Sequence, residues 1–234
     1  DNDGIANESD ALPYNSNESA DDDLDGIGNN EDLDRDGDGL IEIRSLADLD
    51  KIRTNLYLYP IESGCPDTGC AGYELVTDLN FDTNNDGIMN ELDQYWNSGL
   101  GWEPIGSESS GYAYTGVFEG NFHVIRNLYI NRPDQNYVGF FGGLVGATVR
   151  NLGLTGPLTQ ITGKDYVGGL SGASASNPTS VSNCYVQGNI AGQQYVGGLI
   201  GATAADNITA TYATGSVTGT RMTGGLIGTG WTTI

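Results

Sequence analysis

The sequence predicts a mainly β protein, most of which is a right-handed parallel β-helix (a solenoid), preceded by a short helix-containing cap and an extended acidic segment. Three observations favour this fold class. A glycine-rich phrase repeats at a fixed period, a second apolar phrase recurs out of phase with it, and acidic residues gather at the N-terminus. A period of about 20–50 residues is typical of solenoids, because each coil buries its apolar face only by stacking on a neighbour.

The glycine-rich phrase appears four times in the second half of the chain. Its copies read YVGFFGGLVG from Tyr137, YVGGLSG from Tyr166, YVGGLIG from Tyr195 and MTGGLIG from Met222. The first three copies start 29 residues apart, and the last interval is 27. Because the glycines of the GGL stretches fall at matched points of the repeat, we assign them to tight turns where a side chain would clash. We expect each repeat to contribute two or three short strands.

A second phrase marks another wall of the coil. It reads IRNLYI, VRNLGL, VSNCYV and ITATYA in successive repeats. Alternate residues of a strand point to the same face, so the aligned phrases place apolar residues inward at two positions. The first position holds Ile125, Val149, Val181 and Ile208, and the second holds Leu128, Leu152 and Cys184. At a leucine position, Cys184 is expected to be a small buried hydrophobe rather than a reactive thiol.

The same repeats predict two columns of side chains. Asn127, Asn151 and Asn183 lie between the inward positions, and we expect them to hydrogen-bond to one another along the solenoid axis. The tyrosines that open the first three glycine-rich phrases have two interpretations: an aromatic column that supports the coil, or a stripe on which carbohydrate stacks. We favour the supporting column.

The segment 43–114 predicts a compact cap. Ser45 with Asp48 three residues later is typical of a helix start, and apolar residues follow at helical spacing. Residues 73–79 alternate enough to predict a strand. A cap is needed because an uncovered terminal coil exposes apolar surface and unpaired strand edges. The predicted domains are an acidic leader at 1–42, the cap at 43–114 and the solenoid at 115–234.

The charge excludes one class of partner. The formal net charge is -22 and the isoelectric point is ≈ 4.1, whereas affinity for nucleic acid comes mostly from lysine and arginine that neutralise phosphates. We therefore expect no nucleic-acid partner. No run of 18 or more apolar residues occurs, so we expect no membrane insertion. No signal peptide is visible at the first residues, so we expect a mature or trimmed product.

The acidic residues of the leader fall at the spacing of calcium-binding loops. Calcium takes about six to eight oxygen ligands, which a loop of about twelve residues supplies from alternate side chains, a carbonyl after a glycine turn, and a final acid. Residues 21–32 match this pattern fully, with Ile27 contributing its carbonyl: Asp21, Asp23, Asp25, Ile27, Asn29 and Asp32. A partial copy at the N-terminus, without its first ligand, holds Asp1, Asp3, Ile5, Asn7 and Asp10.

Two further loops follow the same pattern. In the third, the alternation runs through Asp32, Asp34, Asp36 and Asp38 to the carbonyl of Leu40 and to Glu42, and the final acid is missing. The fourth lies in the cap and holds Asp82, Asn84, Asp86, Ile88, Asn90 and Asp93. The alternative is a merely solvated acidic surface. A glycine followed by an acid six residues later recurs, however, and this favours Ca²⁺ as a structural cofactor.

Cys65 and Cys70 bracket a short PDTG turn, a spacing that can close as a local disulfide. A disulfide next to calcium-binding acids suits an oxidising environment. We expect an extracellular or cell-surface protein.

No arrangement of residues indicates catalysis. His123, the single histidine, lies beside Glu119 and Arg126 and is expected at a coil edge. A lyase for acidic polysaccharides would need a basic cleft, and the repeat region offers few bases. The motifs of serine hydrolases and zinc proteases are missing from the sequence. We expect no enzymatic activity.

The phrases YVGGLSG, YVGGLIG and NCYVQGNIAG resemble the GLUG motif of bacterial surface adhesins and of non-catalytic parts of some secreted peptidases. The resemblance covers Tyr137 to about Gly228 and implies a protein secreted by a Gram-negative bacterium. The chained DxDxDG units of the leader resemble thrombospondin type 3 repeats, which implies a stalk made rigid by calcium. The loop at 82–93 resembles the calcium loop of EF-hands and dockerins.

Two functions stay open at this point. The first is a calcium-stabilised adhesive protein whose solenoid binds a glycan or protein of a cell surface or matrix. The alternative is a subunit of an extracellular filament, in which copies of the chain join head to tail through the leader and the open last coil. A heterologous contact of this kind does not close and therefore gives fibres.

Overall fold

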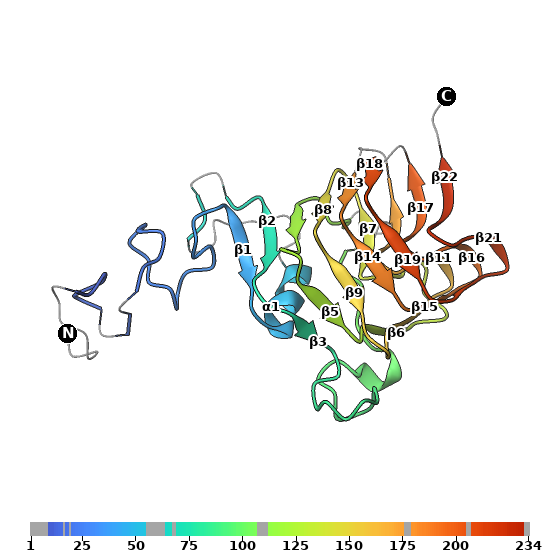
Figure 1. Cartoon of the computed structure of the whole chain (residues 1–234), viewed down its shortest axis with the longest axis horizontal. Coiled ribbons are helices and arrows are strands. Elements are labelled where there is room, and N and C mark those ends of the chain that lie inside the picture. The colour runs from blue at the N-terminus through green and yellow to red at the C-terminus, as the bar shows by residue number, and fades with distance from the viewer. Residues whose placement is uncertain are drawn as a thin grey trace.

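The computed structural model describes residues 9–15, 17–18, 20–54, 64–66, 69–106, 112–175, 179–204 and 207–231. The described residues form a parallel β-solenoid with one short α-helix, which confirms the predicted fold class. The leader projects from one end of the solenoid, and β22 lies at the other (Figure 1).

The strands stack into five parallel sheets, so a complete coil contributes five short strands rather than the predicted two or three. The largest sheet orders β1 (Leu40–Ile43), β2 (Gly72–Leu75), β4 (Val117–Glu119), β8 (Thr148–Arg150), β13 (Ser180–Ser182) and β18 (Asn207–Thr209). The second orders β3 (Leu79–Asn80), β5 (Val124–Arg126), β9 (Gly153–Thr155), β14 (Tyr185–Gln187) and β19 (Tyr212–Thr214).

The other three sheets close the coil. One orders β6 (Tyr129–Asn131), β10 (Gln160–Thr162), β15 (Asn189–Ala191) and β20 (Val217–Thr218). The next orders β11 (Asp165–Gly168), β16 (Gln194–Gly197) and β21 (Arg221–Gly224). The last orders β7 (Phe141–Leu144), β12 (Ser171–Ser174), β17 (Ile200–Ala204) and β22 (Ile227–Trp231).

The glycine-rich phrases form the same corner in successive coils. A Cβ added at Gly168, Gly197 or Gly224 would lie 2.0 to 2.2 Å from a carbonyl oxygen three residues later. No side chain fits in that space, so glycine is required at this turn. The repeat period in the sequence therefore reflects one backbone geometry repeated along the solenoid.

The tyrosines form the supporting column. The rings of Tyr137, Tyr166 and Tyr195 are stacked, with centroids 4.7 and 4.5 Å apart. All three residues have positive φ, near 60°. Because each ring covers the face of the next, the column contributes stacking energy to the coil.

For the first copy of the second phrase, IRNLYI, the structure contradicts the predicted alignment with the later copies. Val149 pairs with Phe118 of β4, whereas Ile125 pairs with Leu154 of β9 in the neighbouring sheet. Both phrases turn at an asparagine with positive φ, 58° at Asn127 and 56° at Asn151. The two corners follow different strands, so their sequence similarity reflects a shared local turn and not a shared place in the coil. The later members of the predicted column, Val149, Val181 and Ile208, are in register.

The asparagines consequently form two columns and not one. Asn183 Nδ2 donates to Asn151 Oδ1 at 3.0 Å, and Asn151 Nδ2 donates to Glu119 Oε1 at 2.9 Å. Asn127 instead donates to Asn80 Oδ1 at 2.9 Å, one corner further along the coil. The predicted hydrogen bonding along the axis is confirmed, and the predicted grouping of all three residues is wrong.

The segment before residue 115 contributes strands to the solenoid sheets. Ser45 caps α1 (Leu46–Lys51) by accepting from the backbone N–H of Asp48, as predicted. The short helix η1 (Ile52–Thr54) follows, and η2 (Asn97–Gly99) lies further on. The strand predicted over 73–79 is two strands, β2 and β3, which belong to different sheets because the chain turns a corner between them. The six-stranded sheet thus begins at β1, well before the predicted solenoid boundary.

The two ends of the solenoid differ. At the first end, Trp102 is fully buried among the rings of Phe81, Tyr95 and Phe140. At the last coil, apolar residues are only half buried, although their partners one coil earlier are exposed by no more than 1%. These pairs are Ile208 with Val181, Val217 with Ile190, and Leu226 with Leu199.

Candidate metal centre

Three loops share one backbone geometry, and each begins with an aspartate of the predicted calcium pattern. Asp21 Oδ2 accepts from Gly26 N at 3.0 Å, and Asp34 Oδ2 accepts from Gly39 N at 2.9 Å. In the cap loop, the carboxylate of Asp82 accepts from the N–H of its own glycine, five residues later, at 3.0 Å. The three glycines have φ between 80° and 91°, which favours glycine. The structure therefore starts the third predicted loop at Asp34. Residues 21–32 are hereafter the first leader loop, and residues 34–45 are the second leader loop.

The next two ligand positions also match between loops. In each loop, the side chain at position 3 accepts from the N–H of position 5, and the side chain at position 5 accepts from that of position 7. These contacts curl each acidic segment around one point. In the leader, each acidic triplet offers one carboxylate oxygen from each residue, and these three oxygens lie within 4.8 Å of one another: Asp21, Asp23 and Asp25 in one loop, and Asp34, Asp36 and Asp38 in the other.

Two leader carboxylates are buried without satisfying both oxygens. Asp32 is 2% exposed and closes the first loop, and Asp34, fully buried, opens the second. Asp32 Oδ2 and Asp34 Oδ1 have no hydrogen-bond partner among the described residues. Burial raises the pKa of Asp32 and raises that of Asp34 to about 6, and neighbouring aspartates act in the same direction.

A buried carboxylate oxygen without a donor is costly in free energy. A divalent cation between the carboxylates would offset both this cost and their mutual repulsion. The donor set is all oxygen, which suits a hard cation such as Ca²⁺. The residues therefore fit the predicted ion.

The remaining predicted ligands of the leader lie on either side of the triplets. Asn29 Oδ1 accepts from Asp22 N at 3.0 Å, and Ile27 follows Gly26 at the position predicted to offer a carbonyl. In the second loop, the corresponding residues Leu40 and Glu42 lie in β1, so this loop leads directly into the solenoid. Glu42 is paired with Arg44. The final position of this loop is Ser45, whose side chain caps α1 and is thereby committed to the helix.

The cap loop differs at its final acid. Asp93 Oδ1 accepts from Thr83 N at 2.8 Å, and its Oδ2 accepts from Asn90 N at 2.9 Å. The side-chain amides of Asn90 and Asn84 each donate to Asp86 Oδ2 at 3.0 Å, and the Ile88 N–H donates to Asp86 Oδ1. These hydrogen bonds lower the pKa of the Asp86 carboxyl. In the cap loop, both carboxylate oxygens of Asp93 therefore accept hydrogen bonds from donors of the same loop. In the leader loops, Asp32 and Asp34 each keep one oxygen without a partner among the described residues.

The partial N-terminal loop falls mostly outside the described residues, which exclude Asp1, Asp3, Ile5 and Asn7. Its last predicted ligand, Asp10, has the same arrangement as Asp32. Asp10 is 8% exposed, its Oδ1 accepts from Leu12 N at 2.9 Å, and its Oδ2 is buried with no partner in the part of the chain that is described. Asp10 thus leaves one carboxylate oxygen open to an ion, as Asp32 does.

Sequence reasoning missed the residues that support the first loop. Glu18 is 3% exposed, and its Oε1 accepts from Asn30 N at 2.9 Å. A Cβ on Gly28 would lie 2.4 Å from the Glu18 side chain, so the two residues pack closely. Arg35 from the second loop donates to the carbonyl of Asn29 at 2.6 Å. The signal in the sequence was Gly28, a glycine at a loop position where the other loops have none.

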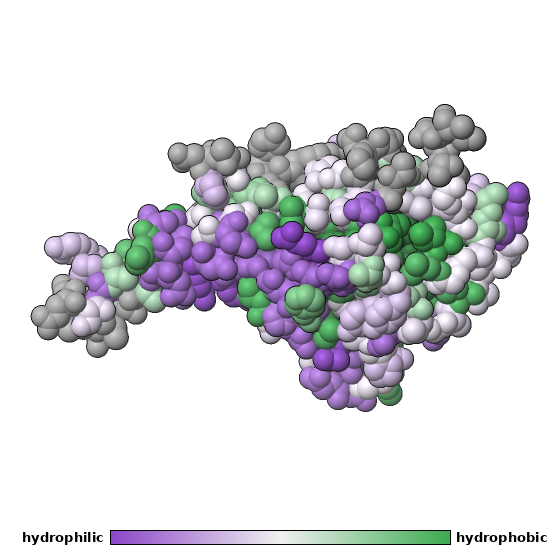
Figure 2. Space-filling model, turned by 45° about the horizontal axis from the view of Figure 1, so that its top comes forward, coloured by the Kyte–Doolittle hydropathy of each residue, from purple (hydrophilic) through white to green (hydrophobic). Residues whose placement is uncertain are grey.

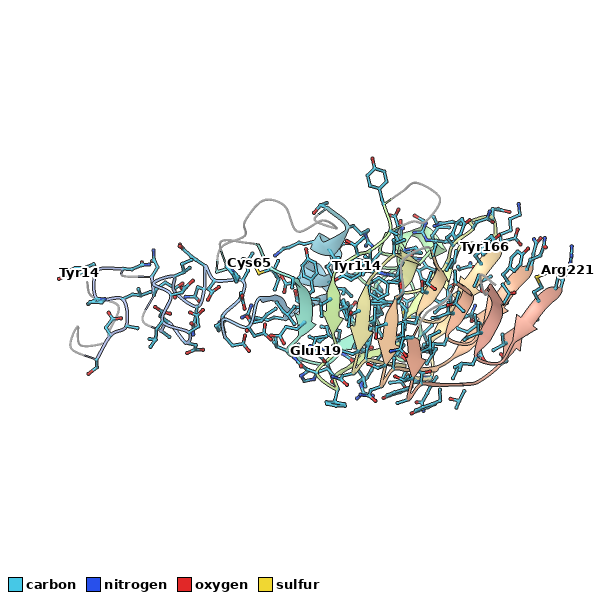
Figure 3. All side chains as sticks on the ribbon, turned by 90° about the horizontal axis from the view of Figure 1, so that it is seen from above. Tyr14, Cys65, Tyr114, Glu119, Tyr166 and Arg221 are labelled. Carbon is cyan, nitrogen blue, oxygen red and sulfur yellow. A yellow bond between two sulfur atoms is a disulfide. The ribbon has the colours of Figure 1, made fainter. Side chains whose placement is uncertain are left out.

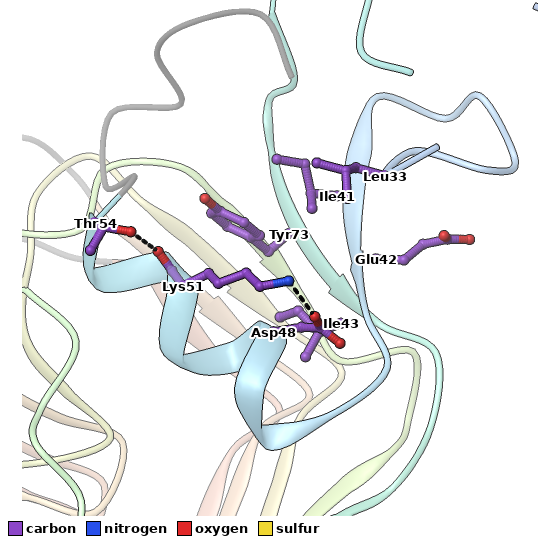
Figure 4. Close-up of a pocket in the computed structure, with 8 residues that line it drawn as sticks. All are labelled: Leu33, Ile41, Glu42, Ile43, Asp48, Lys51, Thr54 and Tyr73. Atoms are coloured by element: carbon purple, nitrogen blue, oxygen red, sulfur yellow. Dashed lines mark hydrogen bonds and ion pairs between the residues drawn. The ribbon is translucent and has the colours of Figure 1, made fainter. Parts of the chain in front are cut away.

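The predicted disulfide is present, with the Cα atoms of Cys65 and Cys70 5.1 Å apart. A pocket of ≈ 330 Å³ lies nearby, between Leu33 of the leader, β1 and α1. Lys51 reaches Asp48 beside it, and Glu42 points away from its apolar side chains (Figure 4). Glu42 nevertheless borders the pocket, together with its strand neighbours Ile41 and Ile43.

His123 and its charged neighbours form pairs with other side chains, and the third cysteine is a buried thiol. His123 Nδ1 lies 3.1 Å from Asp78, which also contacts Arg126, and Arg150 pairs with Glu119. Cys184 is 1% exposed, and burial raises the pKa of its thiol to about 11. Its predicted place as a small buried hydrophobe is confirmed.

Comparisons with known proteins give partial similarities. No family model matches the chain. A stretch of 77 residues, 32% of this chain, is 43% identical to the "Putative Gly-rich membrane protein" of Evansella cellulosilytica, of which it covers 9%. A stretch of 146 residues, 62% of this chain, is 33% identical to Halomucin of Haloquadratum walsbyi, of which it covers 1%. The chain therefore matches only a small part of each relative.

Among solved structures, a chain described as a "putative immunoglobulin A1 protease" from Bacteroides ovatus aligns with a TM-score of 0.49 and 16% identity. The alignment covers 82% of this chain and 62% of that chain. In the described ranges, no helix is long and apolar enough to cross a membrane.

Proposed function

We propose that this chain is a calcium-stabilised, non-enzymatic segment of a secreted or cell-surface protein. In this proposal, a leader made rigid by calcium holds out a β-solenoid for attachment to a glycan or protein. The observation that carries it is the repeated loop geometry, in which buried carboxylates of the leader have oxygens left open for an ion. The names of the two partial relatives, a membrane protein and Halomucin, support a surface location.

The shape and surface of the molecule support a spacer role for the leader. Its side chains are mostly hydrophilic (Figure 2), and it extends from the solenoid toward Tyr14, away from the end marked by Arg221 (Figure 3). Extracellular calcium modules bind with a Kd of about 10⁻⁴ to 10⁻³ M, so at about 10 mM calcium each site contributes about 1 to 3 kcal/mol. Sites of this strength are structural rather than signalling sites.

Calcium removal tests the proposal. Hydrogen exchange and limited proteolysis of the full chain are measured in calcium and in EGTA. We expect EGTA to increase exchange and cleavage within 20–42, and to a smaller degree within 82–93, while the solenoid strands stay protected. Equal protection of the leader in both conditions would contradict the calcium assignment. A glycan array and a matrix-protein array, both without binding, would contradict the adhesive role.

A second candidate is a filament subunit, in which a second copy of the chain packs on the half-buried apolar residues of the last described coil. A hollow of ≈ 640 Å³ lies at this end, lined by residues that include Tyr212, Val217 and Leu226. The parallel edges of β18 to β22 offer backbone donors and acceptors to a further coil. Negative-stain microscopy with and without calcium separates the two candidates, because filaments are expected only for the second. Discrete particles in every condition would exclude it.

A further inference from the structure

The disulfide lies against the junction of the two leader loops, a contact that the calcium pattern does not require. Cys70 is 7% exposed, and its Sγ lies 3.8 Å from Asp34 Oδ2. A Cβ built on Gly64, next to Cys65, would lie 1.6 Å from Asp32 Oδ1 and 3.1 Å from Asp34 N. One end of the disulfide-closed turn therefore lies against Asp34, and the other lies against both Asp32 and Asp34.

These two aspartates connect the loops. Asp32 is the final ligand of the first loop and Asp34 the first ligand of the second, and Asp32 Oδ1 accepts from Asp34 N at 2.8 Å. Gly37 of the second loop packs against the Asp23 carboxylate of the first. A Cβ built on Gly37 would lie only 2.9 Å from Asp23 Oδ2. Any element that fixes the junction therefore acts on both loops together.

The turn also joins the junction to the solenoid. Ala71, directly after Cys70, donates its N–H to the carbonyl of Gly39 at 2.8 Å. Gly39 is the glycine of the second loop, and β2 begins at Gly72. The hydrogen bond between Ala71 and Gly39 is held in place from both sides, because Ala71 lies between the disulfide and a strand of the six-stranded sheet.

A disulfide that closes so short a turn removes little conformational freedom from the unfolded chain, by comparison with one that closes a long loop. Its position against Asp32 and Asp34 suggests a local role. Burying their carboxylates excludes water, which strengthens the attraction of the remaining oxygens for a cation. It also fixes ligands that would otherwise be ordered at the cost of binding energy.

We propose that the Cys65–Cys70 disulfide and Gly64 are positioning elements of the leader's calcium sites, which hold Asp32 and Asp34 in place and shield them from water. The inference rests on the proposed calcium function and deepens it. Calcium affinity of both leader loops then depends on the intact disulfide, and that of the 82–93 loop does not.

The first test compares Cys65→Ser/Cys70→Ser with the parent chain, both carrying Asp82→Asn to silence the cap loop. Calcium binding is measured by titration calorimetry on the full chain. We expect the double serine variant to lose about tenfold in affinity at the leader sites. Terbium luminescence lifetimes in H₂O and D₂O should show at least one additional water ligand per ion. Unchanged affinity and hydration would overturn the inference.

A second variant keeps the disulfide and moves the aspartate. Gly64→Ala places a Cβ against Asp32 Oδ1 at a residue whose φ is +86°. We expect lower affinity mainly at the first loop. Gly225→Ala is the control for an added methyl group, because a Cβ there has no atom within 4 Å, and it should bind as the parent does. Equal binding of the Gly64 and Gly225 variants would contradict the positioning role.

The failure of the two proposals is distinguishable. If the parent chain with Asp82→Asn binds no calcium, the proposed function fails at the leader. If it binds calcium and the serine variant binds it equally well, only the positioning role fails. Circular dichroism melting in EGTA checks that the solenoid of each variant is folded. The predicted ligands of the leader extend only into β1, so we expect the other solenoid strands to fold without calcium.

Discussion

The leader and the solenoid bury opposite kinds of side chain. The buried residues of the described leader before β1 are mainly acids, Asp10, Glu18, Asp32 and Asp34. The interior of the solenoid is apolar, with Phe118, Val149, Val181 and their neighbours almost fully buried. Apolar burial is favourable without any partner outside the chain, whereas buried carboxylates require a counter-charge. We therefore expect the stability of the leader to depend on a bound cation and that of the solenoid to be independent of it.

The cap loop at 82–93 lies between these extremes. It has the ligand spacing of the leader loops, yet backbone donors satisfy both oxygens of Asp93. This loop is anchored beside β3 and the aromatic cluster of Phe81, Tyr95 and Trp102. Shared ligand spacing does not mean equal dependence on the ion, because the surrounding structure decides which oxygens are left open.

The largest expected effect tests the solenoid side of the comparison. Phe118 is fully buried, and its ring lies 5.5 Å from those of Phe140 and Phe141. Phe118→Ala should lower the free energy of unfolding by about 3–5 kcal/mol, because it removes the ring and leaves a cavity. Denaturant unfolding should show the same loss in calcium and in EGTA. Phe122→Ala, at a residue 77% exposed, is the control and should change little. A loss seen only in calcium would remove the distinction between the two parts.

The next effect compares two final acids. Asp32→Asn should reduce calcium affinity of the leader by at least about tenfold, or about 1.4 kcal/mol, and should not loosen the leader in EGTA because it removes a buried charge. Asp93→Asn should loosen its loop in both conditions, by about 1–2 kcal/mol, since an amide nitrogen cannot accept from a backbone N–H. Hydrogen exchange of the two segments measures both effects. The same response at both sites would mean that the hydrogen bonds of Asp93 are unimportant.

A smaller effect concerns the asparagine column. Ala210 follows Thr209, which is the partner of Ser182, so it lies beside Asn183 in the last coil. Its φ is 50°, a conformation that asparagine tolerates better than alanine. Ala210→Asn should stabilise the last coil by about 1 kcal/mol by extending the column to Asn183. Hydrogen exchange of 207–214 is the measurement, with Thr209→Asn as the control that should give no gain. Destabilisation by Ala210→Asn would contradict the ladder.

The smallest effect concerns the buried thiol. The pKa of Cys184 is raised from 9.0 to about 11 by burial, so the folded protein keeps the proton that the unfolded chain loses near pH 9. Its contribution to stability is therefore present below pH 9 and is lost as the pH rises toward 11. Iodoacetamide at pH 8.5 should label Cys184 slowly in the folded protein and rapidly in urea, with or without calcium. Rapid labelling of the folded protein would mean that the solenoid interior opens readily.

The sequence by itself determined the features that depend on short spacings. The repeat period, the required glycines of the coil corner, the N-cap of α1, the Cys65–Cys70 pair and the ligand spacing of the loops all involve residues close in the chain. Local backbone geometry follows from local sequence, because turns, caps and loops are closed by contacts over a few residues.

Only the tertiary structure decided the features that join distant segments. The pairing of Phe118 with Val149, the entry of β1 and β2 into the solenoid sheet, and the contact of Cys70 with Asp34 span about 30 residues or more. Similar phrases such as IRNLYI and VRNLGL occur at different corners, so their likeness could not fix the register. The open oxygens of Asp32 and Asp34, and the closed ones of Asp93, likewise depend on which segments pack against each loop.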